Sequence, residues 1–269
     1  MSAVATTATP FADTRSYRWT SIALQRAALA GGFLLLWHAA ASSVPGYLFP
    51  GPAQTWDALK RILADGVALQ NLAITLYRVT AGFAMATAIG VPLGIVLGSS
   101  KALGGFFAPV LPALNSVSSA IWALIAVVWF GLSDMTPIFV CLMTGLPLIV
   151  TNVWQGTQSV NAEWLELARS VRMPRHKVLL KIYVPAVLPF FFSGARLAFG
   201  FGARVSLVAE ALGSSAGVGY MIVRSADMLQ MANVFAWSIL LVGTIALIDG
   251  LVIRPAEVLL FRWRRSAHA

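Results

Sequence analysis

The residues best suited to bind another molecule are concentrated between positions 161 and 189. Two carboxylates, Glu163 and Glu166, stand there ahead of a dense basic set: Arg169, Arg172, Arg175, His176, Lys177 and Lys181. Such a set can bind a charged surface but contains no catalytic combination of acid, base and nucleophile. It cannot lie in hydrocarbon, where each charge costs roughly 2.5–3.5 kcal/mol even on lenient insertion scales. We therefore predict a loop on the cytoplasmic side of a membrane, where Lys and Arg accumulate.

The same stretch carries an apolar pattern. Trp164, Leu165, Leu167, Ala168 and Val171 recur near helical spacing, which predicts a short amphipathic helix with one apolar stripe. A loop that keeps such a stripe needs a surface to bury it, and docking into a groove on a soluble partner protein meets that need. The alternative is a helix that lies among lipid headgroups, which would also explain the basic face.

Elsewhere, no set of residues predicts catalysis or binding of a metal or nucleotide. His38, His176 and His268 are far apart along the chain, and Cys141 is the only cysteine, in an apolar run where we expect it to pack. The chain has no Walker motif. The glycine-rich GSSAGVGY at 213–220 lacks the lysine of a phosphate loop. We expect a flexible or re-entrant turn there, and no cofactor or metal in this chain.

The composition is that of a membrane protein. Of 269 residues, 58% are hydrophobic and 11% charged, with a mean hydropathy of +0.79, whereas soluble domains carry about 25% charged residues. The net charge of +9 and the pI near 10.4 would also suit a protein that binds nucleic acid. The basic residues, however, lie between apolar segments, so the charge bias of cytoplasmic loops explains them more simply.

Six apolar segments approach the roughly 20 residues that cross a bilayer. They are residues 27–43, 72–97, 106–130, 137–153, 184–212 and 234–260. We expect residues 2–14 to form a disordered tail. Residues 43–71, with three prolines and an amphipathic piece around Trp56, predict an outer loop with a short surface helix.

The distribution of basic residues orients these segments. With both termini inside, the cytoplasmic parts hold Arg15, Arg18, Arg26, Lys101, Arg169, Arg172, Arg175, Lys177, Lys181, Arg262, Arg264 and Arg265. The outer parts hold only Lys60, Arg61 and Arg224. This asymmetry predicts cytoplasmic termini. A cleaved signal peptide is the alternative at the N-terminus, but Trp37 and His38 beside the small-residue site argue against cleavage.

Several polar residues fall within the predicted spans. The ionisable ones are Arg78, Arg196, Arg204, Glu210 and Asp249. They either form a cationic strip beside a path or tie helices together as ion pairs, and for Arg78 and Arg196 we favour ties. Arg196 and Arg204 are eight residues apart and share a helical face. The run Asn115, Ser116, Ser118 and Ser119 either lines a path or allows close helix approach, whereas Gly90, Gly94 and Gly98 favour close helix packing.

The basic loop resembles the cytoplasmic coupling motif of binding-protein-dependent ABC importer permeases. That motif has Glu-Ala-Ala, a glycine four residues on and a later Leu-Pro. Glu166 and Ala168 match its first and third positions, and Pro185 stands at the expected distance. Leu167 replaces the middle alanine, and Arg172 stands where the glycine normally is. We expect Arg172 to adopt a different backbone conformation from glycine, which would shift the helix end, with Pro174 still breaking the helix.

The resemblance extends over about residues 70–265 and is to the nitrate, sulfonate and taurine class of these permeases. It rests on these segments: TLYRVTAGF at 75–83, Gly90, Gly94 and Gly98, WFG at 129–131, SGARLAFGFGA at 193–203, VAEAL at 208–212, GVGYMI at 217–222, and Asp249. Two departures bear on the substrate. The polar run and Ile121-Trp122 precede WFG in place of a proline-rich pair and Ala-Trp, and Arg204 stands where the class tends to have Trp.

The resemblance implies an all-α integral membrane protein of about six transmembrane helices, with the type I ABC importer permease fold and a cytoplasmic coupling helix. It divides the chain into a tail (1–26), a first helix with its outer loop (27–71), a permease core (72–265) with the coupling loop at 155–181, and a second tail (266–269). The implied coupling residues are Glu163, Trp164, Glu166, Leu167, Ala168, Arg169, Val171, Arg172, Met173 and Pro174. The candidate path residues are Arg204, Asn115, Ser118, Ser119 and Trp122.

The resemblance also implies partners in the inner membrane and beside it. These are a second permease copy, two cytoplasmic ABC ATPase subunits that bind ATP and Mg²⁺, and a solute-binding protein that delivers a small, anionic solute. An ATP-independent secondary transporter or channel is the main alternative, although the chain has no internal repeat. A membrane-embedded enzyme is the third, and no convergent set of acid, base or metal ligands supports it.

Overall fold

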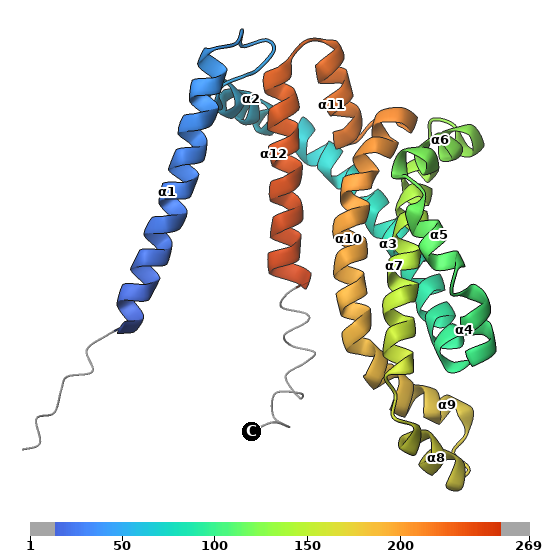
Figure 1. The fold of residues 1–269 in the computed structure, drawn as a ribbon. Helices are drawn as coiled ribbons and strands as arrows, with labels where there is room; N and C mark the ends of the chain where they lie inside the picture. Colours follow the sequence, from blue (N-terminus) through green and yellow to red (C-terminus); the bar gives the residue numbers. More distant parts are fainter. Residues whose placement is uncertain (1–13, 254–269) are drawn as a thin grey trace, which may run out of the picture.

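Residues 14–253, which the computed structural model describes, fold into a series of helices (Figure 1). In chain order these are α1 (Thr14–Ser42), α2 (Pro52–Ala64), α3 (Val67–Ser99), α4 (Lys101–Phe107), α5 (Val110–Ser116), α6 (Ser119–Phe130), α7 (Met135–Gln158), α8 (Ala162–Ser170), α9 (Arg175–Val178), the π-helix η1 (Leu179–Tyr183), α10 (Val184–Gly213), α11 (Val218–Asp227), α12 (Met231–Ile248) and the π-helix η2 (Asp249–Ile253). The predicted surface helix before the second span is α2. Short α8 and α9 lie at one end of the molecule, the α8 end, and α2 and α11 at the other, the α2 end (Figure 1).

Four of the six predicted spans correspond to long apolar helices. Among the described residues, Val67–Ser99, Met135–Gln158, Arg175–Gly213 and Met231–Leu251 are long and apolar enough to cross a bilayer. Only helices close every backbone hydrogen bond within such a segment, which is why apolar runs of this length fold this way in lipid. The predicted end of the last span, residues 254–260, lies outside the described residues.

The span predicted at 106–130 is not one continuous helix. The helical pairs 101–116 and 119–130 could cross a membrane only as one broken unit, bent by 88°. The break falls within the polar run, where Val117 and Ser118 have extended ψ angles of 122° and 140°. Side-chain hydroxyl groups there form hydrogen bonds with nearby backbone groups, which competes with a continuous helix. Ser118 Oγ, for example, accepts a hydrogen bond from Ala120 N–H at 3.4 Å.

The centre of the fold is a tight stack of α3, α7 and α10. Gly94 of α3 lies against Val153 of α7, where an added Cβ would come within 2.7 Å of the valine side chain. Gly82 is similarly close to Cys141, and Gly98 to Thr157. The small residues therefore let the helix backbones approach, which confirms the packing role predicted for the glycine series and for Cys141.

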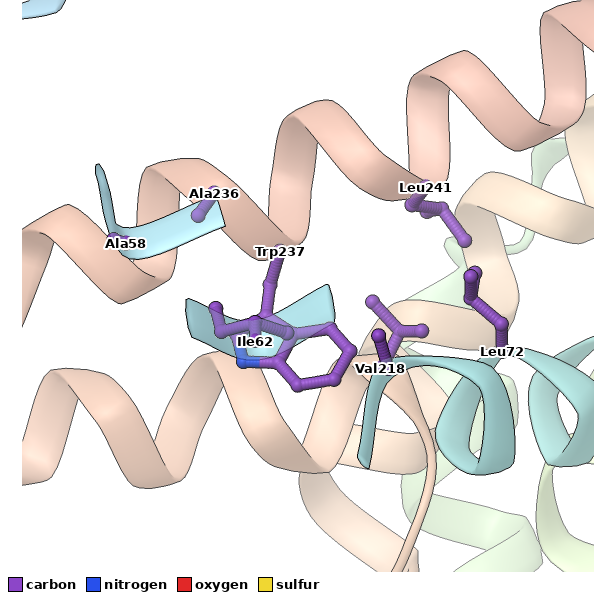
Figure 2. Packing of buried hydrophobic residues seen from close by; sticks show 8 residues of the cluster. Ala58, Ile62, Leu72, Val218, Ala236, Trp237 and Leu241 are labelled. Carbon is purple, nitrogen blue, oxygen red and sulfur yellow. The ribbon is translucent and has the colours of Figure 1, made fainter. Parts of the chain in front are cut away.

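A second cluster of buried residues joins the helices at the α2 end. Trp237 of α12, 1% exposed, packs with Ile62 of α2, Leu72 of α3 and Val218 of α11 (Figure 2). The largest of these side chains belongs to the last span, and its neighbours come from three other helices. This cluster connects α12 to the central stack through the short helices.

Helix α1 stands apart from the central stack in Figure 1. Trp37 Nε1 donates to the carbonyl oxygen of Pro50 at 3.0 Å and stacks on Phe235 of α12, with ring centroids 5.9 Å apart. The helix begins at Thr14 and therefore includes residues 14–26, although the sequence predicts a tail over residues 1–26. Its apolar part, Ala28–Ser42, is shorter than the other spans. The predicted disordered segment lies almost entirely outside the described residues.

Candidate functional site

The predicted coupling helix is present as α8, a nine-residue helix between the two spans α7 and α10. Asn161 caps it, because its Oδ1 accepts a hydrogen bond from Glu163 N–H at 3.0 Å. Glu163 lies in the first turn and Arg169 in the last, which matches the helix dipole at both ends. Pro174 follows as the residue that caps α9. Local capping signals thus account for the start of α8 at Asn161 and for the start of α9 at Pro174.

The C-terminus of α8 corrects the expectation for Arg172. The N–H of Met173 donates to the carbonyl of Ala168 at 2.8 Å, and that of Arg172 to the carbonyl of Arg169 at 3.0 Å. This pair of bonds is a Schellman motif, which requires a left-handed residue after the helix. Arg172 adopts that conformation, with φ of +49°. The arginine therefore takes the left-handed conformation that glycine usually takes at this position of a Schellman motif.

One face of α8 is apolar and uncovered. Trp164, Leu167 and Val171 are 60%, 53% and 61% exposed, whereas Ala168 is buried against the rest of the chain. Glu163, Glu166, Arg169 and Arg172 are exposed around the stripe, and Met173 is half-buried. An exposed apolar stripe of this kind, with charges on its flanks, suits a helix that docks into a groove of a partner.

A cluster of buried charges holds the α2 end together. Glu210 of α10 is fully buried, and its carboxylate accepts hydrogen bonds from Arg78 Nη1 at 3.0 Å and Thr75 Oγ1 at 2.9 Å, both from α3. Arg78 Nε also donates to Asp134 Oδ1 at 2.9 Å. The prediction that Arg78 is a structural tie is confirmed. Sequence reasoning missed Asp134 and Thr75 as its neighbours, although Thr75 lies one helical turn before Arg78.

The glycine-rich turn is fastened to the same cluster. Gly219 N–H donates to Glu210 Oε2 at 2.9 Å, and Gly217 N–H to Asn71 Oδ1 at 2.8 Å. Gly217 has φ of +104°, and a Cβ there would lie 2.6 Å from the Glu210 carboxylate. The turn is therefore held by hydrogen bonds to α3 and to α10.

The remaining intramembrane charges lie along a groove between α10 and α12. Arg196 Nε pairs with Asp249 Oδ1 at 3.1 Å, which confirms the second predicted tie. Arg204 is exposed and lines the same groove of about 560 Å³ as Arg196, as their shared helical face predicts. Within the described part of the chain, Arg204 forms no ion pair.

The other candidate path residues lie elsewhere in the protomer. Asn115 and Ser118 are exposed at the break between α5 and α6, and Ser119 is half-buried beside them. Trp122 packs against Phe139 of α7, with ring centroids 6.2 Å apart. None of the four lines the groove beside Arg204. A single protomer therefore does not bring the polar run and Arg204 together.

Comparison with known proteins assigns the family. Residues 90–258 match the family described as binding-protein-dependent transport system inner membrane component, more than half of the chain. The chain belongs to this family. The matched residues include α7, α8, the basic loop and α10, and the last part of α3 from residue 90. They lie within the permease core predicted from the sequence.

Two relatives and one solved structure agree with the assignment. The permease SsuC of Bacillus subtilis, named for aliphatic sulfonates transport, is 30% identical over 223 residues, covering 83% of this chain and 80% of SsuC. The bicarbonate transport permease CmpB of Synechococcus elongatus is 32% identical over 209 residues, covering 72% and 74%. A chain of the MetNI methionine ABC transporter matches with a TM-score of 0.60 and 16% identity, covering 71% of this chain and 93% of that one.

These similarities confirm the predicted fold and class. The MetNI match shows the type I ABC importer permease fold, and the family and relatives show a multi-pass membrane permease of the nitrate and sulfonate type. Within residues 14–253, no three His, Cys, Asp or Glu side chains lie close enough together to hold a metal ion. The exposed apolar stripe on α8 and the intramembrane charges are the candidate functional groups of this permease.

Proposed function

We propose that this permease forms the translocation path of an ATP-driven importer for a small anionic solute. It works as a pair of identical chains with two cytoplasmic ATPase subunits, which bind ATP and Mg²⁺ and hydrolyse the nucleotide, and with a solute-binding protein that delivers the substrate. In this arrangement the chain spans the inner membrane, and α8 and both termini face the cytoplasm, as the distribution of Lys and Arg favours.

The observation that carries the proposal is the exposed stripe on α8. Three large apolar side chains, Trp164, Leu167 and Val171, stand more than half exposed on a helix outside the membrane spans. Burying an apolar side chain of this size contributes about 1.5–3 kcal/mol. A groove on an ATPase that covers all three would gain several kcal/mol, while Glu163, Glu166 and Arg172 fix its register through charge.

The anionic substrate is supported by two independent features. The relatives described above are named for sulfonates and bicarbonate, both of which are anions. Arg204 adds an exposed guanidinium to a span that is otherwise apolar around it. A cation in that position needs a carboxylate, water or a substrate anion to offset its desolvation.

The test is capture of a candidate ABC ATPase from the same cell, co-expressed with the full-length permease. Leu167→Glu places a charge in the stripe and should abolish capture and uptake while the amount of chain in the membrane is unchanged. Glu166→Lys should act in the same direction by reversing a charge on the helix. Ala162→Glu is the matched control, because it adds a carboxylate to the first turn of α8, on the side opposite the stripe.

Mass measurement of the captured complex checks the stoichiometry, which should be two permease chains and two ATPase subunits. Normal capture and uptake with Leu167→Glu would remove the assignment of α8 as the coupling helix. Uptake that follows an ion gradient and continues without ATP would favour the secondary-transporter alternative.

A further inference from the structure

A groove lies on the side of α8 that faces the rest of the chain. It has a volume of about 540 Å³ and runs between α8, the segment α9–η1 and the last residue of α3. Leu165, Ala168, Val178 and Leu179 form its apolar wall, and Arg169 and Arg175 stand beside them. The groove thus combines an apolar wall with two guanidinium groups. A molecule that fills it needs both an apolar part and a negative charge.

The groove lies where the membrane changes from hydrocarbon to headgroups. Ser99, which lines it, is the last residue of the span α3, and Lys101 follows. The helical segment Arg175–Gly213 has 39 residues, which at 1.5 Å per residue is about 58 Å, well beyond a hydrocarbon core of about 30 Å. Its first turns, including Arg175 and Tyr183, therefore lie at the headgroup level or just outside it.

The two arginines of the groove carry uncompensated charge. The ion pairs in the described part of the chain are Lys60–Asp57, Arg78–Asp134, Arg78–Glu210 and Arg196–Asp249. Arg169 and Arg175 therefore pair with no carboxylate between residues 14 and 253. Guanidinium groups bind phosphate through two parallel hydrogen bonds, and basic pockets between membrane helices bind lipid headgroups.

We propose that this groove binds an anionic phospholipid, with its phosphate at Arg169 and Arg175 and the first part of its acyl chains against the apolar wall. A free phosphate ion would satisfy the arginines but would leave Leu165, Val178 and Leu179 uncovered. A neutral lipid would cover the wall but bring no net negative charge to the arginines. An anionic phospholipid supplies both parts.

The lipid site and the coupling stripe are separate surfaces of one helix. Leu165 and Ala168 face the groove, whereas Trp164, Leu167 and Val171 are exposed outside it. A lipid in the groove would fill the space between α8 and the segment α9–η1, and so fix the angle at which the stripe is presented. The lipid proposal rests on the membrane location of the chain and holds whether or not α8 docks on an ATPase.

The test is native mass spectrometry of the purified full-length chain in detergent, titrated with dioleoyl-phosphatidylglycerol and, separately, dioleoyl-phosphatidylcholine. The chain should bind phosphatidylglycerol preferentially. The double variant Arg169→Gln with Arg175→Gln should bind it about 30-fold more weakly, since each basic residue near a lipid surface contributes about 1 kcal/mol. The matched control, Lys177→Gln with Lys181→Gln, removes the same charge from the same loop at two residues that do not line the groove, and it should bind as the unmodified chain does.

Three results would overturn the proposal. The first is no preference for phosphatidylglycerol in the unmodified chain. The second is an equal loss of lipid binding in the two double variants, which would indicate attraction by net charge alone. The third is displacement of the lipid by millimolar inorganic phosphate. If the groove variant does not fold, a photoactivatable phosphatidylglycerol added to the unmodified chain decides the question. Labelling of residues 165–183 supports the site, and labelling confined to other segments refutes it.

Discussion

Replacing Arg172 with glycine should stabilise the C-terminal end of α8. Arg172 has φ of +49° at the position of the Schellman motif that glycine usually occupies. A residue with a Cβ pays about 1–2 kcal/mol for this left-handed conformation. Glycine avoids that cost but loses more freedom on folding, which takes back about 0.5–1 kcal/mol. The net gain should be about 0.5–1 kcal/mol, or about a two- to fivefold smaller population of the frayed helix end.

Hydrogen exchange of the intact permease in lipid nanodiscs measures this population. The relevant amides are those of residue 172 and Met173, which donate the two closing hydrogen bonds to Arg169 and Ala168. In Arg172→Gly, a peptide covering 162–174 should exchange about two to five times more slowly after correction for intrinsic rates. Ser170→Gly is the matched control in the last helical turn, where glycine costs helix stability and exchange should accelerate.

The critical observation is that the amide exchange rate changes in opposite directions in Arg172→Gly and Ser170→Gly. If Arg172→Gly accelerates exchange, or leaves it unchanged, the arginine is not strained and its side chain must gain a compensating interaction. Arg172→Val provides a second check. A β-branched residue is a strong outlier at positive φ, so this variant should exchange faster than the unmodified chain.

The other predictions concern the buried charges and the groove beside α10. Glu210→Ala leaves Arg78 without its buried partner and should cost about 3–5 kcal/mol of stability. Asp57→Ala breaks the exposed pair with Lys60 and should cost at most about 1 kcal/mol. Thermal unfolding of the purified chain ranks the two variants, and similar decreases in unfolding temperature would mean that the buried cluster contributes little. Gly217→Ala should lower the unfolding temperature strongly, because φ of +104° and the Glu210 carboxylate leave no room for a Cβ, while Gly200→Ala, with no atom within 4 Å of its Cβ, should be neutral or stabilising. Arg204→Trp should insert and assemble normally but slow uptake of an anionic substrate. Loss of assembly would identify Arg204 as a structural tie, and unchanged uptake would place it away from the path.

Much of the architecture could be predicted because the bilayer limits the choices. Apolar runs of about 20 residues become helices in lipid, so four spans follow from hydropathy alone. Helix α8 was predictable for a different reason, since its stripe, its Asn161 cap and Pro174 are local signals read within about fifteen residues. The break at Val117 and Ser118 lies in a run of polar residues. The apolar residues on both sides of that run favour a continuous span, so the sequence pattern alone does not predict the break.

What the sequence by itself determined is therefore the membrane class, the positions of most spans and the amphipathic helix α8, because each depends on the conformational and solvent preferences of neighbouring residues. Only the tertiary structure decided which charges meet. Arg78 could pair with several carboxylates, and its choice of Asp134 and Glu210, separated from it by 56 and 132 residues, depends on how α3 packs against α7 and α10. It also decided that Arg172 is left-handed, since the hydrogen bonds that close α8 are worth more than the strain of one residue. Local pattern specifies local conformation, whereas long-range pairing and tolerated strain follow from the packing of the whole chain.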